Sequence, residues 1–173
     1  MKRLINNIGV LLILALFFGA CEKSAGDEEW GIAKIYMPQA NYEPYITTLQ
    51  QPGATCKIDE ENNKLLIFLG VYRSGLQDLN AYSVDVYTSV STQDGVTPLP
   101  NGMYDVPSEV TCPSGERDAS FYLKVDLAFL QSNIGTDYAI AVGIENPSKY
   151  ELNSDLSVAE IKITTSALFH PGE

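Results

Sequence analysis

Histidine is nearly absent from the sequence, and the one copy, His170, stands three residues from the C-terminus. Enzymes that transfer protons usually depend on histidine or on a pair of carboxyl groups with perturbed pKa values. The sequence also lacks the glycosidase, serine-hydrolase and zinc-protease motifs and a glycine-rich phosphate loop. A carboxylate cluster at residues 59–61 is followed by two asparagines, which is typical of a solvated turn. We therefore expect no enzymatic activity and no catalytic residue.

Basic residues are also scarce. The chain of 173 residues has 11 lysines and arginines against 22 aspartates and glutamates, which gives a net charge of −11. Such a surface repels the phosphates of nucleic acid and the headgroups of anionic lipids. The charge balance therefore excludes nucleic acid as a partner. It also leaves no polybasic patch that could assist attachment to a membrane.

The first 21 residues are the most informative feature that is present. Two basic residues precede an apolar run over residues 8–18, and a Gly-Ala pair leads directly into Cys21. The run has the length of a signal-peptide core and is too short for a comfortable membrane span. This layout is typical of a bacterial lipoprotein signal, in which the cysteine after the cleavage point carries a diacylglyceryl group. We predict a cleaved signal peptide over residues 1–20 and lipidation of Cys21; an uncleaved anchor helix is the alternative.

The mature chain has a predicted tether, a domain and a tail. Residues 21–30 are polar and acidic, which predicts a flexible lipidated tether. Their acidic cluster, residues 27–29, resembles the surface-export signal of Bacteroidota lipoproteins, although a merely soluble linker is the alternative. We expect a lipid anchor in the outer membrane, with the protein facing the cell surface. Residues 31–167 are assigned to one folded domain and residues 168–173 to a disordered tail.

Only three cysteines occur in the chain, and two remain once Cys21 is lipidated. Two cysteines without a supporting histidine are too few ligands for a structural metal, so we expect no metal and no other cofactor. In an oxidising compartment, Cys56 and Cys112 could form a disulfide that contributes about 4 kcal/mol in the chain-entropy model. Two buried, unpaired thiols are the alternative, and the sequence does not decide between them.

From residue 31 onward the hydrophobic pattern has a period of two, which predicts strands. Residues 64–72 and 138–144 are apolar on both faces and should lie centrally in their sheets. A single helical candidate, at about residues 127–133, is one or two turns long. The predicted strands are residues 32–37, 64–72, 81–90, 121–127, 138–144 and 159–164. Turn sequences separate them, and together they predict an all-β, immunoglobulin-like β-sandwich of about seven strands.

Two long segments, LPNGMYDVPSEVTCPSGERDASFYLKVDLAFL and YAIAVGIENPSKYELNSDLSVAEIKI, carry a family resemblance. They resemble the domain of unknown function at the N-terminus of many Bacteroidota surface lipoproteins. The matching markers are Leu99-Pro100, Tyr104, the Pro113–Gly115 turn, Tyr138 and Tyr150. The resemblance covers about residues 31–165 and implies an immunoglobulin-like module, often joined to family 18 glycoside hydrolases or lectin-like domains. It implies an accessory role at most, and it assigns the marker tyrosines to packing.

Glycan recognition depends on aromatic faces beside amides or carboxylates. The best local candidate is Asn41, Tyr42, Glu43 and Tyr45, in an irregular stretch after the first strand. A loop whose tyrosines merely cover the edge of the sandwich is the alternative. The sequence therefore predicts a non-catalytic surface lipoprotein, an accessory module that binds a glycan or glycoprotein for utilisation. The alternative is a structural spacer or a subunit that contacts another protein of the cell envelope.

Overall fold

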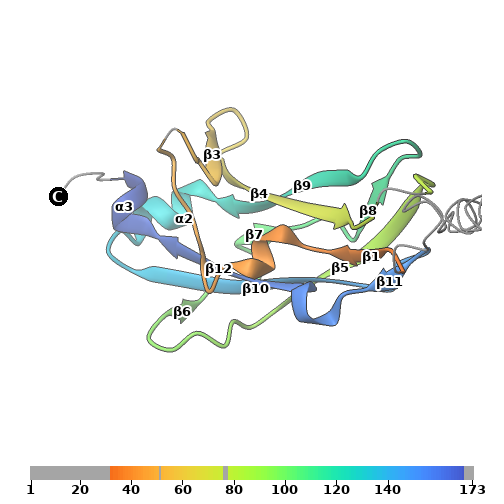
Figure 1. Ribbon diagram of the computed structural model, residues 1–173. Coiled ribbons are helices and arrows are strands. Elements are labelled where there is room, and N and C mark those ends of the chain that lie inside the picture. Colours follow the sequence, from red (N-terminus) through yellow and green to blue (C-terminus); the bar gives the residue numbers. More distant parts are fainter. Residues whose placement is uncertain (1–31, 51, 76–77, 170–173) are drawn as a thin grey trace, which may run out of the picture. The chain divides into compact units, whose positions relative to one another are not determined.

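The computed structural model describes residues 32–50, 52–75 and 78–169 (Figure 1). The predicted signal peptide, the lipid anchor on Cys21, the tether and His170 lie outside the described residues. The folded unit begins at Ile32. Among the described residues, no helix has the length and apolar character needed to span a membrane.

The described residues contain twelve strands in two six-stranded sheets, here named sheet A and sheet B. Sheet A has the order β11-β1-β4-β9-β7, and β3 also pairs with β4. Its strands are β1 (Lys34–Tyr36), β3 (Cys56–Asp59), β4 (Lys64–Arg73), β7 (Tyr104–Asp105), β9 (Asp118–Asp126) and β11 (Glu151–Leu152).

Sheet B has the order β2-β12-β10-β5-β8, and β6 also pairs with β10. Its strands are β2 (Tyr45–Ile46), β5 (Tyr82–Ser89), β6 (Thr97–Pro98), β8 (Glu109–Cys112), β10 (Asp137–Glu145) and β12 (Val158–Thr164). Two short 3-10 helices, η1 (Pro38–Asn41) and η2 (Ser154–Leu156), complete the connections. The predicted all-β sandwich is confirmed. The described part of the chain has twelve strands where about seven were predicted, and five of the twelve have only two or three residues.

The core lies between the two sheets and is formed by alternate residues of the long strands (Figure 1). In β4, Leu65, Ile67, Leu69 and Val71 are all at most 2 % exposed, as period-two alternation requires. The matching inner residues of sheet B include Ile140, Val142, Ile144, Ile161 and Ile163. Strands β4 and β10 are both central, as predicted, so each presents a second, outer face that does not belong to the core.

Two short helices, α2 (Leu127–Ser132) and α3 (Thr165–Phe169), close the end of the sandwich where β4 begins (Figure 1). Helix α2 confirms the predicted turn or two after β9. The carboxylate of Asp126 caps it by accepting the N–H of Phe129 at 2.9 Å.

Helix α3 corrects the predicted tail. Leu168 is 4 % exposed and packs against the core, and the hydroxyl of Thr165 donates to the carbonyl of Thr136 at 2.9 Å. The assignment of residues 168 and 169 to a disordered tail is therefore wrong. Leu168 and Phe169 pack against the apolar core. The short sequence of this segment alone does not reveal that contact.

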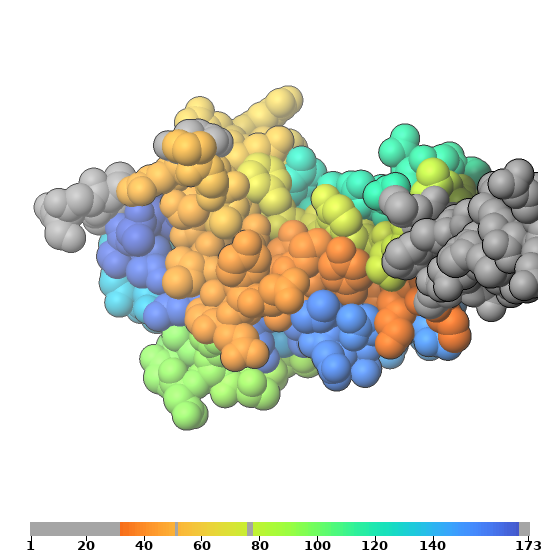
Figure 2. Space-filling view, viewed as in Figure 1, coloured from red at the N-terminus to blue at the C-terminus, as the bar shows by residue number. Residues whose placement is uncertain are grey.

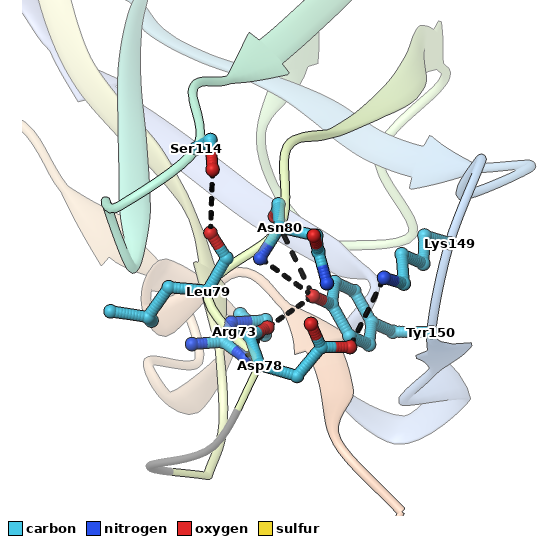
Figure 3. A network of polar contacts seen from close by, with 7 residues as sticks. All are labelled: Arg73, Asp78, Leu79, Asn80, Ser114, Lys149 and Tyr150. Atoms are coloured by element: carbon cyan, nitrogen blue, oxygen red, sulfur yellow. Dashed lines mark hydrogen bonds and ion pairs between the residues drawn. The ribbon is translucent and has the colours of Figure 1, made fainter.

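A polar network closes the opposite end of the sandwich (Figure 3). The guanidinium of Arg73, 2 % exposed, donates to the carbonyl of Asp78 at 2.7 Å and lies 5.2 Å from the ring of Tyr150. The hydroxyl of Tyr150 donates to the same carbonyl and accepts the N–H of Asn80. Lys149 forms an ion pair with the carboxylate of Asp78 at 3.0 Å. This marker tyrosine therefore has a structural role, as the family resemblance implied.

Candidate functional site

The cluster predicted from the sequence lies on the segment between β1 and β2. In Figure 2 this orange segment covers the edge of the sandwich between the two sheets. The rings of Tyr42 and Tyr45 are 5.6 Å apart but tilted by 56°, and Tyr42 is 59 % exposed while Tyr45 packs against the core. Burial, with Tyr42 nearby, raises the pKa of Tyr45. The amide of Asn41 donates to the carbonyl of Pro38, and Glu43 is exposed.

The structure therefore brings Tyr42 and Tyr45 together without making them coplanar. A ring stacked on one of these tyrosines would meet the other at an angle, and only Tyr42 is widely accessible. The geometry favours the alternative stated above, in which these tyrosines cover the edge of the sandwich.

The two described cysteines are free and buried. Cys56 lies opposite Ile67 in sheet A, whereas Cys112 lies opposite Tyr82 in sheet B and close to Arg73. Ile67 and Arg73 are six positions apart in β4, which is about 20 Å along the strand. A disulfide needs Cα atoms about 6 Å apart. The predicted disulfide is therefore wrong, and the alternative prediction of two buried, unpaired thiols is confirmed. Burial raises the pKa of Cys56 to about 11 and also raises the pKa of Cys112.

The outer face of sheet A carries four aromatic rings in two neighbouring pairs. We name Tyr36, Phe68, Tyr72 and Tyr122, together with Leu66, the aromatic face. Tyr36 and Tyr72 are register partners with ring centroids 6.1 Å apart, and Phe68 and Tyr122 are register partners with centroids 5.6 Å apart. Tyr72 is 38 % exposed and the other three rings are half-buried. Packing thus holds the rings in place while part of each ring faces solvent.

A low floor separates the two ring pairs. Between Phe68 and Tyr72 on β4 stands Gly70, and its partner on β9 is the small Ser120. Four residues along a strand span about 13 Å, and the ring of Tyr72 leans over Gly70, which is buried. The side-chain carbonyl of Gln39 accepts the N–H of Gly70 at 3.2 Å, which places an amide at the edge of this floor. The surface is therefore an extended platform with polar groups beside the rings.

Charge is distributed unevenly between this face and the rest of the domain. Strand alternation places on the outer face of sheet A four of the eight basic residues described and five of the 17 acidic ones. The face is nearly neutral, while the remaining described residues have four basic and twelve acidic side chains. The basic residues of the face are Lys34, Lys57, Lys64 and Lys124, and its acidic residues are Asp59, Asp105, Asp118, Asp126 and Glu151.

Sequence reasoning missed the aromatic face. Phe68 and Tyr72 lie in a run that is apolar on both faces, so alternation did not separate inner from outer residues. Tyr122 was the available signal, because it alternates with the buried residues of β9.

A hollow of about 210 Å³ lies among residues of β5, β6, β7 and β10. It is lined in part by Thr88, Leu99, Asn101 and Tyr104. The hydroxyl of Tyr104 donates to the side-chain carbonyl of Asn101 at 3.0 Å and lies 3.4 Å from the hydroxyl of Thr88. The hollow is below the usual range for ligand pockets, about 300–1,000 Å³, and its polar groups already bond one another. Among the described residues no group of three or more histidine, cysteine or carboxylate side chains could hold a metal ion.

Comparison with solved structures finds chains of low sequence identity. The Calx CBD1 domain in its apo form is 18 % identical, with a TM-score of 0.45, and the match covers 77 % of this chain and 96 % of that one. A Bacteroides ovatus ATCC 8483 protein named "putative carbohydrate binding protein" is 14 % identical, with a TM-score of 0.47, over 76 % of this chain and 36 % of that one. A multidomain Bacteroides ovatus protein that includes DUF1735 is 13 % identical, with a TM-score of 0.43, over 76 % and 43 %.

The chain spans less than half the length of these two Bacteroides proteins. No curated protein matches the sequence. The family model described as "-like, N-terminal domain" matches residues 33–151, which is more than half of the chain. The chain therefore belongs to this N-terminal-domain family, a Bacteroidota domain of unknown function.

Proposed function

We propose that this protein is a non-catalytic glycan-binding module and that the aromatic face of sheet A is its binding surface. The observation that carries the proposal is the arrangement of Tyr36, Phe68, Tyr72 and Tyr122 in two pairs on one exposed sheet face. A carbohydrate-binding function stands in the name of one similar Bacteroides ovatus protein, and the proposal extends that function to this chain.

The physical argument is that a sugar ring has an apolar C–H face that packs against an aromatic ring. Contacts between aromatic rings contribute about 0.5–1.5 kcal/mol beyond the area that they bury, which is a guide to each stacked sugar. The rings of the aromatic face are already held by packing, so ligand binding orders few side chains. We expect dissociation constants no tighter than about micromolar, which corresponds to roughly 8 kcal/mol.

Two double variants test which surface binds. Tyr72→Ala with Tyr122→Ala removes one ring from each pair of the aromatic face, and Tyr42→Ala with Tyr45→Ala removes the cluster predicted from the sequence. A glycan array with the mature chain identifies a ligand, and calorimetry then measures its affinity. We expect the first variant to bind at least thirtyfold more weakly and the second to bind as the wild type does. Thermal unfolding of each variant controls for loss of the fold.

The reverse result would assign binding to the segment between β1 and β2. Loss of binding in neither variant would contradict a role for both surfaces, and a protein that binds no glycan on the array would contradict the proposed function.

A second candidate function is contact with another protein of the cell envelope. Tyr42 and Ile46, on one segment at the edge of the sandwich, are 59 % and 54 % exposed, and exposed apolar side chains that lie together can form part of a protein-binding surface. A photoreactive residue at position 46 should then cross-link to one defined envelope protein in living cells. Cross-linking that is diffuse, or equal to that from exposed position 166 on α3, would argue against a specific partner.

We also propose that the protein is lipid-anchored through Cys21 in the outer membrane, with the domain facing the cell surface. The support is the signal layout of residues 1–21. Cys21→Ser should abolish acyl labelling and release the protein from the membrane fraction. A variant that stays anchored, or a wild type that takes up no acyl label, would contradict the proposal. Protease added to intact cells should digest the domain if it faces outward.

A further inference from the structure

We propose that the glycan bound by the aromatic face is acidic, and that Lys57 and Lys124 bind its carboxylate or sulfate groups. This inference rests on the proposed function and specifies the class of ligand. It is carried by the position of two exposed lysines beside the Phe68–Tyr122 ring pair.

The register places the two lysines in one row across three strands. Lys57 on β3 is the partner of Leu66 on β4, and Leu66 is the partner of Lys124 on β9. Neighbouring strands are about 4.8 Å apart, so the two lysine Cα atoms are separated by about 10 Å. Leu66, 8 % exposed, lies buried between them, and the half-buried Phe68–Tyr122 pair follows about 7 Å further along the sheet. The Cα atoms of the two lysines therefore lie on either side of β4, next to the ring pair whose exposed parts can meet the apolar face of a sugar ring.

Both lysines are available to a ligand. They are exposed, and the three ion pairs found among the described residues use Lys64, Lys149 and Lys162 instead. The ammonium of Lys57 lies 5.3 Å from the centroid of the Tyr122 ring, so charge and ring already form one surface. Asp105 is the register partner of Lys124 on β7, yet within the described part of the chain these two form no ion pair.

The ion pairs of the described residues leave these two lysines to an external anion. The described residues have about twice as many acidic as basic side chains, yet Lys57 and Lys124 form no ion pair among them, although Lys57 interacts electrostatically with Asp59. A polymer with one charge on each sugar or each disaccharide can place that charge between the two lysines. Nucleic acid has one charge for about every 1.7 Å of duplex and would bring many phosphates toward the acidic remainder of the domain.

The test varies the charge of the ligand and not the salt concentration. Added salt would weaken both the attraction by the lysines and the repulsion by the acidic remainder of the domain, so its net effect would not separate them. Calorimetry with the mature chain compares matched polymers: polygalacturonate with its full methyl ester, and chondroitin sulfate with its desulfated, carboxyl-reduced form, both of which are neutral. A single-stranded DNA oligonucleotide is included as a polyanion of another class. We expect at least one acidic polymer to bind tenfold or more tightly than its neutral counterpart and more tightly than the DNA.

Charge variants then assign the preference to the lysines. Lys57→Gln with Lys124→Gln should reduce the acidic-to-neutral ratio of affinities to about one while binding of the neutral polymer persists. Lys162→Gln, which removes the same charge from sheet B, should leave the ratio unchanged. Equal binding of each pair by the wild type, an unchanged ratio in the double variant, or tighter binding of DNA would overturn the inference. In the first two outcomes the proposed glycan-binding function would stand, whereas absence of binding to every glycan would refute that function itself.

Discussion

The outer faces of the two sheets differ although their central strands have similar sequences. On sheet A, the outer residues of β4 include Leu66, Phe68 and Tyr72, and the rings remain partly exposed. On sheet B, the outer residues of β10 are Ala139, Ala141 and Gly143, and all three are buried. Both strands are apolar on both faces, yet one presents rings to solvent and the other is covered.

The cover over sheet B is the protein's own chain. Glu160 on β12 accepts hydrogen bonds from the hydroxyl of Ser91 and from the N–H and hydroxyl of Thr92, which follow β5. Since β10 lies between β12 and β5, the chain must cross β10 to make these contacts. The ring of Tyr87 also lies over Gly143. Small residues thus admit a covering segment, whereas the large residues on β4 leave rings that are partly exposed to solvent.

The same substitution on the two sheets tests this comparison with the largest expected effect. A Cβ at Gly143 would overlap the ring of Tyr87, whereas a Cβ at Gly70 would meet the ring of Tyr72 at an ordinary 3.4 Å. Gly143→Ala should lower the free energy of unfolding by about 1–3 kcal/mol. Gly70→Ala should be neutral or stabilise by up to about 1 kcal/mol, because it restricts the unfolded chain. Urea unfolding measures both.

Tyr87→Ser provides the control for this pair. In the Gly143→Ala background it should restore most of the lost stability, because the overlapping ring is gone. Equal effects of the two glycine variants would show that the outer faces do not differ in the way described.

Release of the covering segment is expected to have the next largest effect. Glu160→Ala removes the hydrogen bonds to Ser91 and Thr92 and should lower the free energy of unfolding by about 1–2 kcal/mol. Hydrogen exchange of residues 138–142 should also become faster, since their outer face is less protected. Unchanged exchange there, with faster exchange only at residues 90–96, would show that the segment does not protect β10.

Removal of the carboxylate that caps α2, which follows strand β9 of sheet A, is expected to lower the free energy of unfolding by a smaller amount. Asp126→Ala should cost about 1 kcal/mol. The N–H of Phe129 and the ammonium of Lys64 hold the pKa of Asp126 below its ordinary 3.8. A lowered pKa in the folded state means that this contribution is present above 3.8 and is lost as the pH falls below it. The difference between wild type and variant in urea should therefore shrink in acid; a difference that grows would contradict the assignment.

The smallest effect is expected from reduction of the cysteines, which should not change the stability of the domain. A reducing agent should leave the unfolding midpoint unchanged, because Cys56 and Cys112 are not bridged. At pH 8 both should react with iodoacetamide only after denaturation, since burial and the raised pKa of Cys56 keep the nucleophilic thiolate rare. Peptide mass spectrometry of a Cys21→Ser variant measures the iodoacetamide modification of each of these two cysteines. A Cys56–Cys112 peptide in the unreduced protein would contradict the structure.

The long strands were predictable because each contributes a run of period two or a run apolar on both faces. The two-residue strands were not, because two residues define no period, and they are strands only through pairing with distant segments such as β10 with β6. Helix α2 was predictable from its capping aspartate and apolar turn. Leu168 was assigned to a tail because its burial depends on the core, which is distant in sequence.

The candidate site was less predictable than the fold. Each ring pair of the aromatic face joins residues more than 30 positions apart, so it exists only once the register of β4 with β1 and β9 is fixed. The sequence could not decide whether Cys56 and Cys112 form a disulfide for the same reason. The distance between them is set by the parts of β4 beside which they lie in the folded domain and not by their spacing in the chain. Local clustering of tyrosines at residues 42 and 45 was visible in the sequence and drew attention to the edge of the sandwich instead.

The placement of the first and last elements also has a mechanical consequence. Strand β1 begins beside Ser74 at one end of β4, while α3 packs with α2 at the other end (Figure 1). A pulling force applied between residues 32 and 169 would therefore act along the strands. The hydrogen bonds that join β1 to β4 and β11 would be loaded together, in shear, and not opened one at a time. The domain is built to resist extension along the same axis on which the two ring pairs are arranged.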